Sequence, residues 1–159
     1  MSEDLRSVSS IVLRKSQRRL DLLSGNRVLK SYRAALGFEP VGDKSREGDG
    51  KTPEGEFYVC ARNPESKYHL SLCLSYPAEA AARQGLEAGL IDQGEFDQII
   101  KAAAERSSPP QRTGLGGEIY IHGGGTERDW TDGCIALTNT EMTELFALIP
   151  VGTRVAIYP

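Results

Sequence analysis

The sequence lacks the features that mark several large classes of protein. No apolar run approaches the roughly 20 residues that a membrane-spanning helix needs, so none is predicted. The three cysteines are an odd number and include no Cys-x-x-Cys pair, which argues against a disulfide framework and against structural zinc. The net charge of -3 comes with no basic patch large enough to suggest nucleic acid binding. A Walker phosphate-binding pattern is also missing.

Basic residues gather at one place, and they are Arg14, Lys15, Arg18 and Arg19. They fall across a predicted strand–turn–strand. Charged side chains at such a turn are usually solvated. We therefore expect an exposed hairpin tip here and not a phosphate site.

Length and composition are typical of one domain. With 159 residues and 39% hydrophobic content, residues 1–159 can build a single core. Short apolar segments separated by turn residues predict strands over Ser10–Leu13, Arg19–Leu23, Val28–Ala34, Phe57–Ala61, Tyr68–Ser75, Glu118–His122 and Arg154–Tyr158. Leu70, Leu72 and Leu74 alternate along one of these strands, so we expect them to face the core.

Helical patterns interrupt the strands. Pro77–Gln84 is rich in alanine, and Glu95–Arg106 has apolar residues at helical spacing, with Asp92 as its expected N-cap. Thr138–Glu141 has the pattern of a capping box that opens a third helix containing Met142, Leu145 and Phe146. Ser107–Gly117 is rich in proline and glycine and reads as a loop. The sequence thus predicts a mainly β, β-rich α+β domain with a helical insertion before the strand that ends at His122.

A hairpin turn is expected at Asn63-Pro64-Glu65-Ser66, because proline presets φ there. That turn would place His69 near Cys60 across the hairpin and Cys73 nearer Phe57, which argues against a Cys60–Cys73 disulfide. A metal cluster of the histidines and cysteines is conceivable. Without a Cys-x-x-Cys pair it is the weaker interpretation, and we expect no metal.

One histidine stands upstream of one cysteine in a glycine-rich context. A short apolar segment ends at His122 and is followed by three glycines, and Cys134 lies twelve residues after His122, directly behind Gly133. A free thiol titrates near ~8.5 and needs a base to become a thiolate. Glycine permits the turn that aims backbone amides at a developing oxyanion. This context favours a nucleophile over the buried small hydrophobe that most free cysteines are.

These residues resemble the L,D-transpeptidase catalytic domain, the cysteine transpeptidases of bacterial peptidoglycan. Ile121-His122-Gly123 and Thr131-Asp132-Gly133-Cys134-Ile135 are similar to the family's histidine strand and its Ser/Thr-His-Gly-Cys segment. Gly48–Phe57 is similar to its Thr-Pro-x-Gly-x-Phe segment, and the likeness extends to Gly152–Val155. The chain departs at Asp132, where the family usually has a second histidine, and in a shorter loop after His122.

The resemblance implies that Cys134 is the nucleophile and His122 its general base. Gly133 and Cys134 are expected to supply amides for the oxyanion, and Thr131 and Gly123 to shape the turns. His122 also needs a partner on its other ring nitrogen, for which Asp132 and Asp129 are candidates. The alternative for either carboxylate is an exposed loop position.

Four further residues are candidates for a groove that binds sugar or peptide, and they are His69, Tyr120, Trp130 and Arg112. Rim packing or a plain structural role is the alternative for each. The resemblance requires neither a metal nor an organic cofactor.

Three functions remain open at this point. The first is acyl transfer on peptidoglycan tetrapeptide stems through a thioester at Cys134. The second is a hydrolase of the same fold, such as an L,D-carboxypeptidase acting on muropeptides. The third is a non-catalytic peptidoglycan-binding module. The family resemblance implies the cell envelope or periplasm, whereas Met1–Val8 has no signal-peptide pattern and would suggest the cytoplasm.

Overall fold

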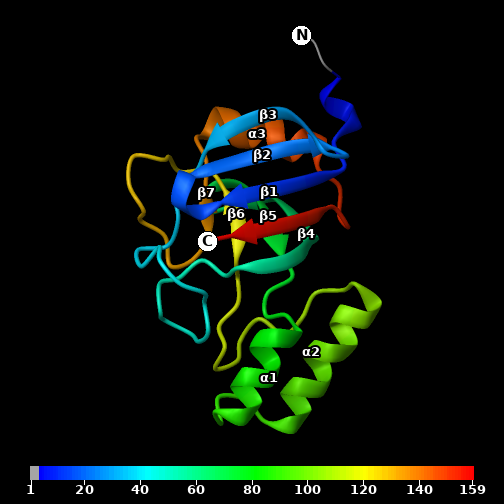
Figure 1. Ribbon diagram of the computed structural model, residues 1–159, viewed down its shortest axis with the longest axis vertical. Helices are drawn as coiled ribbons and strands as arrows, with labels where there is room; N and C mark the ends of the chain where they lie inside the picture. Colours follow the sequence, from blue (N-terminus) through cyan, green and yellow to red (C-terminus); the bar gives the residue numbers. More distant parts are fainter. Residues whose placement is uncertain (1–3) are drawn as a thin grey trace.

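A computed structural model describes residues 4–159 as one eight-stranded sheet with three α-helices (Figure 1). The strands are β1 (Ser10–Arg14), β2 (Arg19–Ser24), β3 (Arg27–Arg33), β4 (Gly55–Ser66), β5 (His69–Leu74), β6 (Tyr120–His122), β7 (Ile135–Ala136) and β8 (Arg154–Tyr158). The helices are α1 (Glu79–Glu87), α2 (Gln93–Glu105) and α3 (Asn139–Leu148), with short 3-10 turns at Leu5–Ser7 and Lys15–Gln17. The predicted β-rich α+β class is confirmed.

The spatial order of the strands is β3-β2-β1-β8-β4-β5-β6-β7. The pairs β1–β8 and β6–β7 are parallel, and the other neighbours are antiparallel. After β3 the chain crosses to the opposite edge, where Ala35 exchanges two backbone hydrogen bonds of 2.9 Å with Ala136 of β7. This crossing ties the first quarter of the chain to the segment that contains Cys134.

The core lies between the sheet and α3. Leu72 and Leu74 are fully buried there and Leu70 is partly buried, so the expected leucine face is confirmed. Met142 and Leu145 of α3 complete this core. Thr138 caps α3 by accepting from the Glu141 amide at 3.2 Å. The Glu141 carboxylate accepts from the Thr138 hydroxyl and not from its amide, so only half of the predicted capping box forms.

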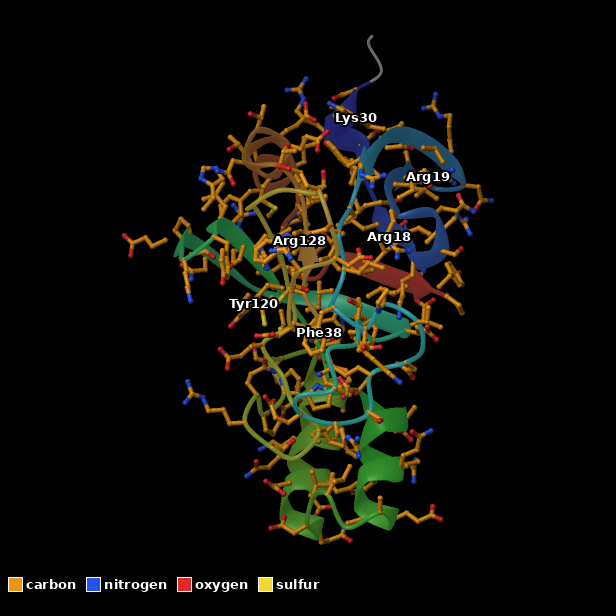
Figure 2. All side chains as sticks on the ribbon, turned by 90° about the vertical axis from the view of Figure 1, so that its left-hand side faces the viewer. Arg18, Arg19, Lys30, Phe38, Tyr120 and Arg128 are labelled. Atoms are coloured by element: carbon orange, nitrogen blue, oxygen red, sulfur yellow. The ribbon has the colours of Figure 1, made fainter. Side chains whose placement is uncertain are left out.

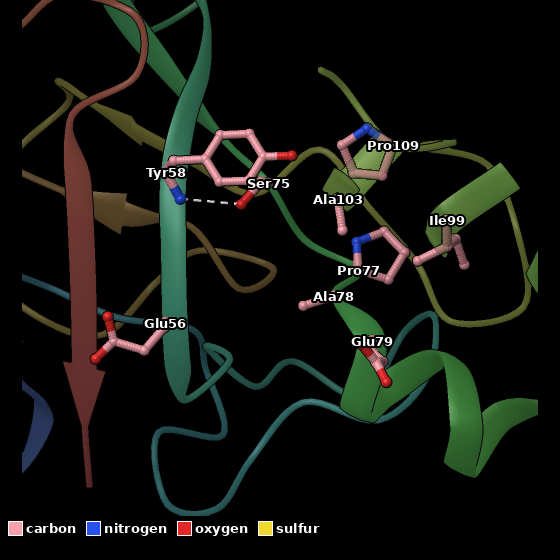
Figure 3. Close-up of a pocket in the computed structure, with 9 residues that line it drawn as sticks. All are labelled: Glu56, Tyr58, Ser75, Pro77, Ala78, Glu79, Ile99, Ala103 and Pro109. Atoms are coloured by element: carbon pink, nitrogen blue, oxygen red, sulfur yellow. Dashed lines mark hydrogen bonds between the residues drawn. The ribbon is translucent and has the colours of Figure 1, made fainter. Parts of the chain in front are cut away.

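Helices α1 and α2 form the predicted insertion between β5 and β6 and extend away from the sheet (Figure 1). Asp92 caps α2 in a full capping box with Glu95. The pair has a small core of its own, made of Ala82, Ile91, Ile99 and Leu115. A cavity of about 200 Å³ separates the helices from β4, and Tyr58 points across it to donate to the carbonyls of Ala102 and Ser107 (Figure 3). Tyr58 of β4 thus ties the insertion to the sheet.

The predicted hairpin turn at Asn63–Ser66 is wrong. Strand β4 continues to Ser66, the turn lies at Lys67-Tyr68, and β5 starts at His69. The register is irregular between Asn63 and Ser66, which accommodates a proline that cannot donate to the ladder. As a result His69 pairs with Ser66 and Cys73 pairs with Ala61, beside Cys60. The expected separation of the two cysteines is therefore wrong as well.

The expectation of a solvated basic hairpin tip is also wrong. Lys15 is only 2% exposed, and its ammonium donates to the carbonyls of Gly42 and Thr52 and to the Glu54 carboxylate. A buried ammonium is stable only when it is paired and hydrogen-bonded in this way. Arg18 is held by an ion pair with Asp129. Lys15 therefore anchors the segment from Gly42 to Glu54, and Arg18 anchors the loop that contains Asp129.

Candidate active site

Strands β6 and β7 bring the histidine and cysteine segments together. Their parallel pairing sets Ile121 beside Ile135 and His122 beside Ala136. Ile121 and Ile135 are fully buried in the core. Since successive side chains alternate between faces, His122 and Cys134 share the opposite face.

The Cys134 sulfur is held by two backbone groups. It accepts from the Tyr120 amide at 3.3 Å and donates to the Glu118 carbonyl at 3.2 Å. Burial raises the pKa of Cys134 to about 11, and the nearby carboxylates of Asp132 and Glu118 add to that rise. The resting group is therefore a thiol. Within residues 4–159 no hydrogen bond joins this sulfur to His122.

His122 is buried under aromatic rings. Tyr68 stacks on its ring at 4.7 Å between centroids, and Trp130 approaches edge-on at 5.6 Å. Burial lowers the pKa of His122, although the contact with Gly123 opposes that shift. The imidazole is consequently neutral at neutral pH.

The ring nitrogen Nδ1 of His122 lies 2.5 Å from the Gly123 carbonyl oxygen. A carbonyl only accepts, so Nδ1 carries the proton and Nε2 keeps its lone pair. The partner of Nδ1 is therefore this carbonyl and neither of the two candidate carboxylates. Asp129 binds Arg18 and the Leu36 amide, and Asp132 is an exposed loop residue.

The turn before Cys134 is built by Thr131 and Gly133. The Thr131 hydroxyl donates to the Cys134 carbonyl at 2.7 Å and accepts from the Gly133 amide at 3.1 Å. Gly133 has φ of +144°, and a Cβ there would lie 2.8 Å from the Lys51 carbonyl oxygen. Only glycine fits both conditions. The Gly48–Phe57 segment thus packs directly against the cysteine turn.

A network that the sequence patterns did not reveal fixes this loop. Arg18 binds Asp129 through a 2.8 Å ion pair, and Asp129 also accepts from the Leu36 amide at 3.0 Å. Burial opposes ionisation of Asp129, but the hydrogen bonds from Arg18 and Leu36 outweigh it and lower its pKa. Phe38 then donates its amide to the Thr131 carbonyl at 2.9 Å. Arg18, between β1 and β2, and the segment after β3 therefore position the loop that leads to Cys134.

A hollow of about 390 Å³ lies over the aromatic residues that cover His122, and its lining is Tyr68, Gly124, Gly125, Glu127, Arg128 and Trp130, without His122 or Cys134. Of the four predicted groove residues, only Trp130 lines it. Tyr120 is half-buried in β6. It lies on the side of the molecule that faces the viewer in Figure 2, and Arg128 lies on the same side. Tyr68 was missed, because an aromatic residue at a hairpin turn carries no signal for a stack on a distant histidine.

Two predicted groove residues lie elsewhere. His69 bonds through Nε2 to the Thr143 hydroxyl of α3 at 2.6 Å. Arg112 is exposed on the loop that follows α2. Neither residue lines the hollow.

Features for metal or membrane binding are absent from the described residues in two respects. Over residues 4–159 no group of three or more His, Cys, Asp or Glu residues is arranged to hold a metal ion. In the same range no helix is long and apolar enough to cross a bilayer.

Comparison with known families gives a match over nearly all of the sheet and the site. The family model of the L,D-transpeptidase catalytic domain, YkuD, matches residues 9–157. The chain belongs to this family. A Bacillus subtilis (strain 168) protein named "Putative L,D-transpeptidase YqjB" is 29% identical over 152 residues, which cover 92% of this chain and 69% of that protein.

Solved structures agree on the L,D-transpeptidase fold. The helical cell shape determining protein Pgp2 from Campylobacter jejuni matches with a TM-score of 0.65 at 22% identity, over 94% of this chain and 47% of that one. An L,D-transpeptidase from Xylanimonas cellulosilytica matches with a TM-score of 0.56 at 18% identity, over 96% and 62%. The chain thus spans about half the length of Pgp2. At these identities the likeness shows the fold alone.

Proposed function

We propose that this L,D-transpeptidase-family domain catalyses cysteine-dependent acyl transfer on peptidoglycan tetrapeptide stems, with a thioester intermediate at Cys134. The observation that carries the proposal is the state of the two side chains on one face of β6 and β7. His122 keeps the lone pair of Nε2 because Nδ1 is engaged by Gly123, and Cys134 rests as a thiol. A neutral base beside a neutral thiol is the starting state that general-base catalysis needs.

The reaction then begins with movement of the sulfur. Rotation about the Cα–Cβ bond of Cys134 takes Sγ away from the Glu118 carbonyl and toward His122. His122 accepts the thiol proton, and the sulfur attacks the carbonyl of the diamino-acid residue in the stem. His122 returns the proton to the departing amine of terminal D-alanine, and the acyl group stays on Cys134 as a thioester.

The oxyanion needs donors near that carbonyl. We expected the amides of both Gly133 and Cys134, but the Gly133 amide already donates to Thr131. The Cys134 amide is therefore the candidate donor from this turn. Thr131 and Gly133 act by fixing the direction of that amide.

The hollow over Tyr68 and Trp130 is the proposed binding site for the stem. Trp130 and Tyr68 offer flat faces to sugar or peptide, and Arg128 can pair with a carboxylate. Tyr120 and Arg112 are proposed as outlying contacts. His69 is proposed to act only by supporting the hairpin, since it bonds to α3.

Water in place of an amine acceptor gives hydrolysis, and an L,D-carboxypeptidase is the second candidate. Asp132, which replaces the family's usual histidine, favours it because an exposed carboxylate near Cys134 can act as a base toward an attacking water. The transpeptidase would act in the cell envelope, and the hydrolase would act on muropeptides, including recycled ones in the cytoplasm. Neither reaction needs a metal or an organic cofactor.

One experiment separates the candidates. The full chain is incubated with disaccharide-tetrapeptide, and the products are read by mass. A cross-linked dimer supports the transpeptidase, and a disaccharide-tripeptide supports the carboxypeptidase. No product from folded protein, together with measurable binding, would replace both with a non-catalytic peptidoglycan-binding module.

A further inference from the structure

The two cysteines outside the proposed mechanism lie against each other. Between the pairs Val59–Leu74 and Ala61–Cys73 the β4 ladder gains one residue, and that residue is Cys60. In such a bulge two residues of one strand oppose one of the other, so Cys60 and Ala61 both oppose Cys73. The Cys60 thiol donates to the Cys73 carbonyl oxygen at 3.5 Å, so its sulfur lies against Cys73.

The two cysteines differ in their exposure to solvent. Cys60 is partly exposed, whereas Cys73 is buried. The loop after α2 covers them, with Ser108 donating to the Cys60 carbonyl at 3.4 Å and the Cys73 thiol lying 3.9 Å from the Gln111 amide oxygen. A small oxidant can therefore reach Cys60, while Cys73 is available only to its neighbour.

We propose that Cys60 and Cys73 form a redox-active dithiol, which hydrogen peroxide converts into an intramolecular disulfide while Cys134 stays outside the bond. The juxtaposition at the bulge carries this proposal, and it is independent of the proposed peptidoglycan chemistry. Cross-strand neighbours lie within the Cα separation that a disulfide spans.

The chemistry runs in two balanced steps. The Cys60 sulfur attacks one oxygen of the peroxide, the O–O bond breaks, and one water leaves, so that Cys60 becomes a sulfenic acid. The Cys73 sulfur attacks the Cys60 sulfur, the S–O bond breaks, and the second water leaves. Two thiols and one peroxide thus give one disulfide and two waters.

The ionisation of the pair fits this order of attack. The neighbouring Cys73 lowers the pKa of Cys60, which raises the share of Cys60 that is thiolate at neutral pH. The neighbouring Cys60, together with burial, raises the pKa of Cys73. The more exposed sulfur is therefore also the better first nucleophile.

The test uses the reduced full chain without substitution. It is treated with a small excess of hydrogen peroxide under native conditions, and then alkylated and digested with trypsin without reductant. Cleavage at Lys51, Arg62, Lys67 and Arg83 places Cys60 on peptide 52–62 and Cys73 on peptide 68–83. The expected product is these two peptides joined, lighter by two hydrogens and separated again by dithiothreitol, with Cys134 alkylated.

Matched variants assign the order. In a Cys134→Ala background, Cys73→Ser should leave Cys60 as a sulfenic acid that dimedone traps. Cys60→Ser should give at least about tenfold less dimedone adduct at Cys73, because a buried protonated thiol reacts slowly. Full alkylation of Cys60 and Cys73 after treatment of the unsubstituted chain, or a bond from either of them to Cys134, would overturn the proposal.

Discussion

Both faces of β5 and β6 carry buried side chains, but the two faces are built in different ways. On the core face, Leu72, Leu74 and Ile121 are fully buried among other apolar side chains. On the opposite face, His122 is only 2% exposed, but its Nδ1 bonds to the Gly123 carbonyl oxygen and its ring stacks on Tyr68. Burial alone therefore does not separate core from site. On these two strands the difference lies in the polar partner and the stacked ring of His122.

The difference has a direct consequence for substitutions. A core-face side chain contributes through apolar area and packing volume, so its loss lowers the free energy of unfolding. A side chain on the site face contributes through the direction of a few polar atoms, so its loss lowers the rate. The following predictions test this division, from the largest effect to the smallest.

Replacing the proposed nucleophile should have the largest effect. Cys134→Ala is expected to abolish turnover of disaccharide-tetrapeptide, because no other thiol lies in the Thr131–Gly133 turn. The measurement is product formation by mass, with circular dichroism to show that the fold is kept. Cys60→Ala combined with Cys73→Ala is the control and should keep most of the activity. Turnover near the unsubstituted rate in Cys134→Ala would refute the mechanism.

Removing the proposed base should come next. His122→Ala is expected to lower kcat by about 10²–10⁴, the usual contribution of a general base. The midpoint of thermal unfolding serves as the control, since loss of the ring also removes the stack with Tyr68. A normal rate in folded His122→Ala would mean that another group takes the thiol proton.

On the core face, Leu72→Ala should leave the chemistry and remove stability. A fully buried leucine truncated to alanine costs about 2–5 kcal/mol of unfolding free energy. Urea unfolding gives that value, and kcat measured well below the unfolding midpoint should change less than threefold. A large loss of kcat with unchanged unfolding would erase the distinction between the faces.

Acylation of Cys134 should follow pH in a defined direction. Burial raises the pKa of this thiol to about 11, so below that value each pH unit should increase the thiolate fraction about tenfold. We expect a small carbapenem to form one adduct by intact-protein mass spectrometry in the unsubstituted chain and none in Cys134→Ala. In His122→Ala no base takes the thiol proton, so the rate there should follow the thiolate fraction and rise between pH 6 and 9. An equally steep rise in the unsubstituted chain would show that His122 does not take the proton.

The smallest effect is expected at the other histidine. His69→Ala removes a bond to Thr143 on α3 and no contact in the hollow. We expect kcat to change less than about threefold, with any loss in the KM for the stem peptide. A loss as large as that of His122→Ala would transfer the base role to His69.

Local patterns predicted much of the fold because the signals are local. Alternation places Leu72 and Leu74, and the Asp92 cap with Glu95 is a contact between near neighbours. The turn at Lys67-Tyr68 could not be read, since Pro64 sits in an irregular stretch of ladder that resembles a turn in sequence. The partner of Asp129 is Arg18, 111 residues away. No periodicity reports a contact of that separation.

The place of β8 in the sheet has a consequence for how the chain folds. The last strand lies between β1 and β4, and its parallel pairing with β1 joins Ser10 to Arg154. During synthesis the first hairpin must therefore wait for residues 154–158 before the sheet becomes continuous. Sheets that depend on such distant pairings fold slowly. Removing β8 should break the sheet between β1 and β4, and the bridge between Ala35 and Ala136 would then have to hold the first hairpin to the strands of the site.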